Sequence, residues 1–134
     1  MLGVDINYLA VLVAAIAYFV LGGLWYSPVL FGNMWKKAMN IKDGNMKGLG
    51  KVMAGGFVAN LLTTYVMAVV LGLVGVATFA VAAQVAFWMW LGFMAPMLIN
   101  SVLYEGKSWN LFIINAAYQL IGLSLAAGIV AIWV

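Results

Sequence analysis

The stretch "LWYSPVLFGNMWKK", residues 24–37, decides where the first helix of this chain ends. A long apolar run precedes it, and the first clustered positive charges close it. Pro28 cannot donate a backbone hydrogen bond and biases the preceding residue away from helix. We therefore expect the first helix to end at Trp25 and Tyr26, and the chain to turn at Pro28.

The composition excludes an ordinary soluble domain. Of 134 residues, 68% are hydrophobic and only 7% are charged, which is too little polar cover for a soluble surface. The bilayer is therefore the expected solvent, and membrane lipids are expected partners. The chain has no cysteine and no histidine, so thiol and imidazole chemistry are absent. We expect no metal and no other cofactor.

Four apolar segments are each long enough to cross a hydrocarbon core of about 30 Å, which takes roughly 20 helical residues. They are too long and too continuously apolar for barrel strands. We expect one all-α domain over residues 1–134, an integral membrane four-helix bundle. The expected spans are about 6–26, 52–73, 78–103 and 109–133. Thr78 and Ser108 are the expected N-caps of the last two spans.

The lysines indicate how the bundle lies in the membrane. Five lie between Lys36 and Lys51, in the first connection, and the sixth is Lys107, in the third connection. Four spans place these two connections on one side, which the positive-inside rule makes the cytoplasmic side. Both termini are then outside. The clustering indicates membrane topology rather than binding to nucleic acid.

The segment after Pro28 has a helical pattern of its own. Apolar residues recur at three- and four-residue spacing, with Lys36 and Lys37 on the opposite face. We expect a short amphipathic helix over about 29–40, which follows the first span in the chain and lies in the cytoplasmic interface of the membrane. The expected interfacial anchors are Trp25, Tyr26, Pro28, Trp35, Lys36 and Lys37.

No charged residue lies in the central part of any expected span. Ion-coupled pumps and transporters usually carry an intramembrane ionisable group, so the sequence disfavours that class. Amide and hydroxyl chemistry remains. The candidate intramembrane polar or binding residues are Asn60, Thr64, Gln84, Pro96, Asn100, Asn115 and Gln119.

An amide without a partner is costly in hydrocarbon, so we expect the polar faces to turn inward. In the third span this face consists of residues at four-residue spacing, which are Gln84, Trp88, Gly92, Pro96 and Asn100. Pro96 should kink the helix there, because it cannot donate to the carbonyl of Gly92. The amides either hold the helices together or bind a small molecule or lipid headgroup, and both interpretations stay open.

Depth allows two amide pairings. Asn60 and Gln119 both lie near the middle of their spans, and Asn100 and Asn115 differ in depth by about 4.5 Å. Small residues at four-residue spacing permit close helix approach within or between chains. These pairs are Gly55 and Ala59, Ala82 and Ala86, and Ser124 and Gly128. A homo-oligomer is the expected assembly.

Three motifs carry a resemblance to a known family. They are W-Y-S-P-x-L-F-G at residues 25–32, W-L-G-F at 90–93 and I-N-A-x-Y-Q at 114–119. The chain resembles, over nearly its whole length, the bacterial membrane proteins of domain-of-unknown-function family 1761. The resemblance implies a small four-helix protein of the bacterial inner membrane. It implies no activity.

Two functions stay open from the sequence. One is a non-enzymatic membrane module that assembles with itself or with a partner protein. The alternative is a channel or facilitator for a neutral or weakly polar solute, using the midplane amides and the Pro-kinked third helix. An intramembrane enzyme is disfavoured, because acid–base and metal chemistry have almost no candidate residues.

Overall fold

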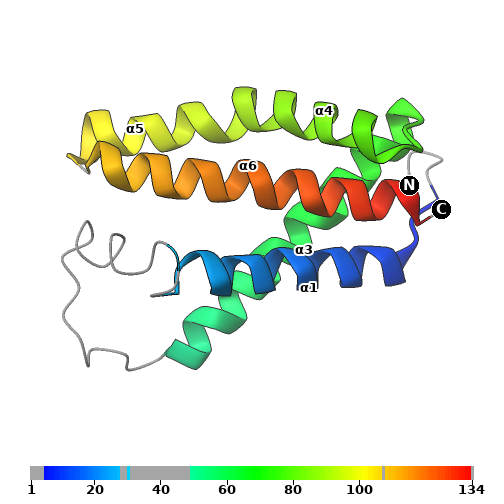
Figure 1. The fold of residues 1–134 in the computed structure, drawn as a ribbon, viewed down its shortest axis with the longest axis horizontal. Helices are drawn as coiled ribbons and strands as arrows, with labels where there is room; N and C mark the ends of the chain where they lie inside the picture. Colours follow the sequence, from blue (N-terminus) through cyan, green and yellow to red (C-terminus); the bar gives the residue numbers. More distant parts are fainter. Residues whose placement is uncertain (1–4, 28–29, 31–48, 107, 134) are drawn as a thin grey trace.

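The computed structural model describes residues 5–27, 30, 49–106 and 108–133, and this part of the chain is helical without strands (Figure 1). The elements are α1 Tyr8–Trp25, α3 Leu49–Val74, α4 Phe79–Met89, the π-helical turn η1 Trp90–Met94, α5 Ala95–Glu105 and α6 Trp109–Ile132. Four helical stretches are long and apolar enough to cross a membrane, and α4, η1 and α5 together form the third. The prediction of an all-α fold with four helical stretches able to span a membrane is confirmed.

Side-chain caps fix where the helices begin. Thr78 accepts a hydrogen bond from the backbone N–H of Val81, and Ser108 accepts one from that of Leu111. Each satisfies a backbone donor that the first helical turn leaves free. Both predicted N-caps are therefore confirmed. Asn7 caps α1 in the same way, through the N–H of Ala10.

The two short connections turn at glycines in the left-handed region. Gly75 has φ +82° after α3, and Gly106 has φ +70° at the end of α5. A residue without a Cβ adopts this conformation at little cost. These turns make the neighbouring spans antiparallel.

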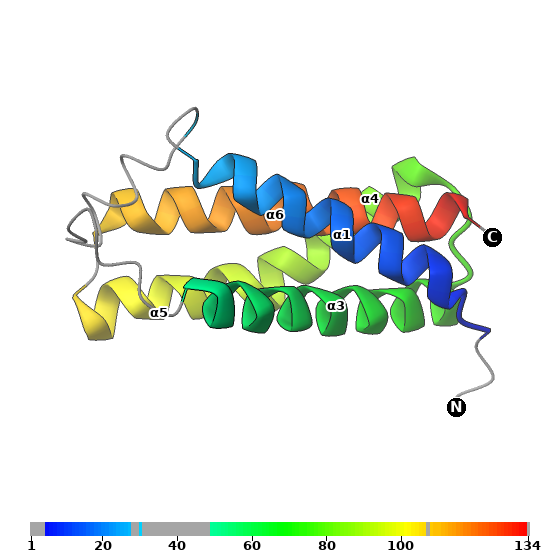
Figure 2. The same cartoon turned by 90° about the horizontal axis from the view of Figure 1, so that it is seen from below.

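The last span, α6, is the centre of the bundle. It packs against α1, α3 and all three segments of the third span. A larger share of its residues is buried than in any of the other three spans. Figure 1 shows α3 crossing α1 and α6 obliquely, and Figure 2, seen from below, shows α1 lying across α6, which it contacts. The side-chain amide of Asn7 donates to the carbonyl of Trp133 at 2.9 Å. The two ends of the described chain therefore meet at one end of the bundle.

Small residues let the third and fourth spans approach closely. Ala82 and Ala86 are fully buried on α4, as are Ala126 and Ala127 on α6. The predicted pair of small residues on α4 thus packs inside the chain. Gly55 and Ala59 are both exposed on α3, so this pair has no such neighbour.

The irregularity predicted at Pro96 is a π-helical turn. The backbone N–H of Ala95 donates to the carbonyl of Trp90, five residues back, and a turn of this kind is typically inserted singly into an α-helix. The helix continues as α5 beyond Pro96. The predicted interfacial helix over 29–40 lies outside the described residues except for Leu30, and so do Pro28, Trp35, Lys36 and Lys37.

Candidate functional site

A cluster of polar groups at membrane depth lies where α1 runs antiparallel to α6. We call this contact the tyrosine seam. It comprises Tyr18, Gly22, Trp25 and Tyr26 of α1 and Ile114, Asn115, Tyr118, Gln119 and Gly122 of α6. Both helices repeat the same unit, a tyrosine followed four residues later by a glycine.

Each tyrosine ring of the seam lies on the glycine of the facing helix. A Cβ atom at Gly122 would come within 2.5 Å of the Tyr18 ring. One at Gly22 would come within 2.7 Å of the Tyr118 hydroxyl oxygen. The ring centroids of the two tyrosines are 5.4 Å apart and tilted by 59°, an arrangement that aromatic pairs favour. Only glycines leave room for both rings at this helix separation.

The seam tyrosines also provide hydrogen-bond donors for α6 and α1. The Tyr18 hydroxyl donates to Oε1 of Gln119, and the Tyr118 hydroxyl donates to the backbone carbonyl of Tyr18 at 3.1 Å. Tyr18 is 1% exposed and Tyr118 is 7% exposed. The amide of Asn60, on α3, is a further polar neighbour of the Tyr118 hydroxyl. Gln119 therefore bonds a tyrosine in the described structure, and Asn60 lies near another.

Trp25 and Tyr26 close the seam at the end of the first span. Trp25 Nε1 donates to the carbonyl of Ile114 at 3.0 Å, and the Tyr26 hydroxyl donates to Oδ1 of Asn115 at 2.6 Å. Both side chains are half-buried. Trp25 and Tyr26 end the span, as predicted. Their indole N–H and hydroxyl groups, however, bond to α6.

The second span turns Thr64 inward. Its side chain is fully buried, and its hydroxyl donates to the carbonyl of Asn60 one turn earlier, at 2.7 Å. Such a bond satisfies the hydroxyl within its own helix. Thr64 is therefore a packing residue that needs no partner from another helix.

The prediction that the ladder of the third span turns inward is wrong. Gln84, Trp88, Gly92, Pro96 and Asn100 are all exposed. The inward indole is that of Trp90, whose Nε1 donates to the carbonyl of Ala116 at 2.9 Å. The two amides for which depth allowed a contact, Asn100 and Asn115, are not joined by a hydrogen bond in the described structure, since Asn115 accepts from Tyr26.

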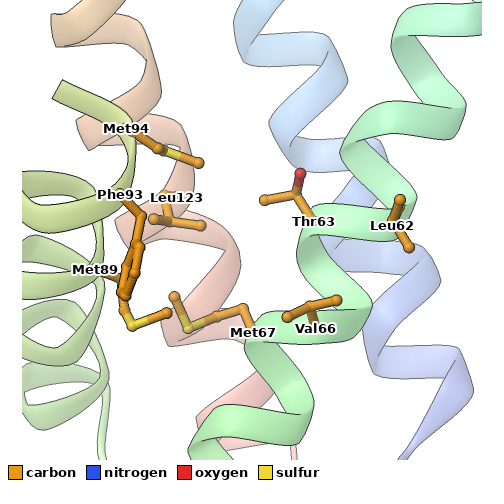
Figure 3. Close-up of a pocket in the computed structure, with 8 residues that line it drawn as sticks. All are labelled: Leu62, Thr63, Val66, Met67, Met89, Phe93, Met94 and Leu123. Atoms are coloured by element: carbon orange, nitrogen blue, oxygen red, sulfur yellow. The ribbon is translucent and has the colours of Figure 1, made fainter. Parts of the chain in front are cut away.

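Two hollows lie beside α6, and neither is lined by the midplane amides. The smaller, about 100 Å³, lies between α5 and α6, and its polar lining residues are Ser101 and Asn115. The larger, about 260 Å³, lies between α3 and the π-helical turn (Figure 3). Its lining is Leu62, Thr63, Val66, Met67, Met89, Phe93, Met94 and Leu123. The Thr63 hydroxyl is the polar side-chain group in that lining, so the larger hollow suits an apolar occupant.

The sequence placed Gly122 and Tyr118 on or near the polar face of the last span, but it did not predict the seam or the residues that organise it. Tyr18, Tyr118 and Trp90 supply donors to α6 or α1, and Gly22 and Gly122 make room for the rings. The signal that could have found them is the Tyr-x-x-x-Gly unit, which occurs in the first span and again in the last. Its two copies face each other only when these spans are antiparallel neighbours.

Comparison with known proteins identifies the family and no nearer relative. No curated protein and no solved structure matches the chain significantly. The family model described as "Protein of unknown function (DUF1761)" matches residues 9–131, which cover all four spans but for one residue at each end. The chain therefore belongs to the DUF1761 family, as the motifs quoted above indicated.

Proposed function

We propose that this protein is a non-enzymatic module of the bacterial inner membrane that assembles with copies of itself or with a partner membrane protein. The observation that carries the proposal is that the side-chain amides of Gln119 and Asn115 are bonded inside the bundle. Both amides of α6 accept hydrogen bonds from tyrosines of α1. Amides that are satisfied inside the bundle hold helices together and leave no polar path for a solute.

The lipid-facing surface supports the same function. Large apolar side chains are exposed on every span, with Val20, Leu62, Phe93 and Ile113 each exposed by 60% or more. Apolar contact alone does not associate helices in lipid, but close packing does, and a four-helix chain with so little interior leaves most of its helix surface available for it. We therefore expect the partner to be a membrane protein.

The proposed orientation places both termini outside and the lysine-bearing connections in the cytoplasm. The hydrogen bond from Asn7 to Trp133 brings the two ends of the described chain to one side. The lysine distribution then selects the opposite side as cytoplasmic.

The test is reconstitution of the purified chain into liposomes. We expect no flux of small neutral solutes, such as glycerol or urea, above that of protein-free liposomes. We also expect energy transfer between copies labelled at Asp5→Cys with donor and acceptor dyes, because Asp5 is exposed ahead of α1 and the chain has no other cysteine. Solute flux that Gln119→Leu abolishes would overturn the proposal.

The hollow beside η1 favours a second candidate, a facilitator for an apolar or weakly polar solute. Its volume of about 260 Å³ adjoins an irregular helical turn at membrane depth, and π-helical turns occur frequently at functional sites. In this case solute flux would depend on the residues that line the larger hollow rather than on the tyrosine seam. Thr63→Leu would abolish it and Gln119→Leu would not.

A further inference from the structure

The outward face of the third span carries polar side chains that have no hydrogen-bond partner among the described residues. We call it the outward ladder, and it consists of Gln84, Trp88, Gly92, Pro96 and Asn100. Trp88 is 67% exposed. Neither its indole N–H nor the amides of Gln84 and Asn100 form a hydrogen bond in the described part of the chain.

The ladder lies within the hydrocarbon layer. The third span runs over 27 residues, Phe79–Glu105, so Gly92 stands at its midpoint. At 1.5 Å per residue, Trp88 is about 6 Å from the midplane, and Gln84 and Asn100 are about 12 Å from it. A hydrocarbon layer of about 30 Å extends about 15 Å to either side. Polar groups at these depths are costly when only acyl chains surround them.

The π-helical turn keeps the ladder on one side of the span. In an α-helix, residues four apart drift by about 40° at each step, so five such residues would spread over about 160° and some would turn inward. A turn closed by an i→i−5 bond is wider than an α-turn and reduces this drift. All five ladder residues are exposed, on both sides of η1.

A second copy of the chain satisfies this face, and an acyl chain does not. A side-chain amide is both a donor and an acceptor, and an indole N–H is a donor. Copies inserted in the same orientation present Gln84 and Trp88 at matching depths. A two-fold axis along the membrane normal then brings each Gln84 amide near the Gln84 and Trp88 of the other copy. Gly92 has no side chain, and the space beside it is open, since a Cβ atom there would meet nothing within 4 Å. A helix of another copy could therefore approach closely at this position.

We propose that the outward ladder is the face through which two copies of this chain dock, side by side and parallel, with Gly92 at the crossing point. This inference rests on the proposed function, since it names the surface by which the module assembles with itself. Interhelical hydrogen bonds and close packing at a glycine are the forces that associate helices in lipid.

Disulfide crosslinking in the membrane tests the crossing point. The chain has no cysteine, and a disulfide requires Cβ atoms about 3.5–4.5 Å apart. Gly92→Cys should form a disulfide-linked dimer on oxidation in proteoliposomes at high lipid-to-protein ratio. The matched control is Ile121→Cys, which lies near the midpoint of α6 and is 46% exposed. It should stay monomeric.

Energy transfer between labelled copies tests the polar pairs. The double variant Gln84→Leu, Trp88→Phe should weaken association by roughly 3- to 10-fold, with no loss of folded protein. Trp109→Phe makes the same aromatic change on α6, where Trp109 is 56% exposed, and should have no effect. Its association should equal that of the unsubstituted chain.

Three outcomes would overturn the inference. If copies associate but Ile121→Cys crosslinks and Gly92→Cys does not, the docking face is wrong and self-assembly stands. The same conclusion follows if the double variant associates as strongly as the unsubstituted chain. If no energy transfer occurs at any lipid-to-protein ratio, self-assembly itself fails, and with it the docking face.

Discussion

The ring of Tyr18 lies on the backbone of Gly122, so close that a Cβ atom at this glycine would come within 2.5 Å of ring carbon Cε1. Tyr118 and Gly22 form the reciprocal contact one turn away on each helix. The first and last spans are therefore joined by two tyrosine-on-glycine contacts. The hydrogen bonds of the tyrosine seam join the same two helices, so they depend on the close distance between α1 and α6.

Adjacent glycines in α1 give a matched test of the close approach. Gly22→Ala would place a methyl group against the Tyr118 hydroxyl, whereas a Cβ atom at Gly23 meets nothing within 4 Å. We expect Gly22→Ala to lower the free energy of unfolding by about 1–3 kcal/mol, as overpacking does. Gly23→Ala should leave it unchanged or raise it by up to about 1 kcal/mol.

Gly122→Ala should be at least as destabilising as Gly22→Ala. The methyl group would meet the body of the Tyr18 ring, which is 1% exposed, rather than the end of a side chain. Reversible unfolding in mixed micelles measures all three variants. Equal stabilities for Gly22→Ala and Gly23→Ala would contradict the packing of Tyr118.

Two tryptophans of the third span should differ in their effect on folding. Trp90 donates to the carbonyl of Ala116, whereas Trp88 is 67% exposed. Trp90→Phe should cost about 1 kcal/mol of unfolding free energy, because it removes an interhelical hydrogen bond. Trp88→Phe should leave the unfolding of the dispersed monomer within about 0.5 kcal/mol of the unsubstituted chain. A larger loss of unfolding free energy for Trp88→Phe than for Trp90→Phe would show that Trp88 is the indole that turns inward.

The proposed orientation can be tested by labelling single cysteines. A membrane-impermeant maleimide should modify Asp5→Cys in intact spheroplasts. It should modify Glu105→Cys only after the membrane is opened, because Glu105 ends α5 at the opposite end of the bundle. Labelling of Glu105→Cys alone in intact spheroplasts would invert the proposed topology.

Much of the fold could be predicted from local signals. The four spans follow from apolar runs of sufficient length, and the caps at Thr78 and Ser108 follow from hydroxyl side chains at the starts of such runs. Asn115 and Gln119 were rightly expected to face other helices. Their partners could not be named, because pairing Tyr18 with Gln119 requires knowing which spans are neighbours and in what register.

The outward ladder shows where the helical period misleads. The inward orientation was inferred from a regular α-helix and from the cost of lipid-exposed amides. Trp88 and Trp90 are two residues apart and point to nearly opposite sides of the helix, and Trp90 is the one that turns toward α6. The π-helical turn at Trp90–Met94 then changes the phase of the residues that follow. Pro96 signalled an irregularity there. A single sequence does not say whether a proline is accommodated by a kink or by a wider turn.

The central claim is that the amides of α6 serve to bond the first span. A double-mutant cycle between Tyr18→Phe and Gln119→Leu, measured by reversible unfolding in mixed micelles, tests it most directly. We predict a coupling free energy of about 1 kcal/mol, with Tyr8→Phe as a control, because Tyr8 is 69% exposed and should show no coupling to Gln119→Leu. Additivity of Tyr18→Phe and Gln119→Leu within about 0.3 kcal/mol would contradict the claim.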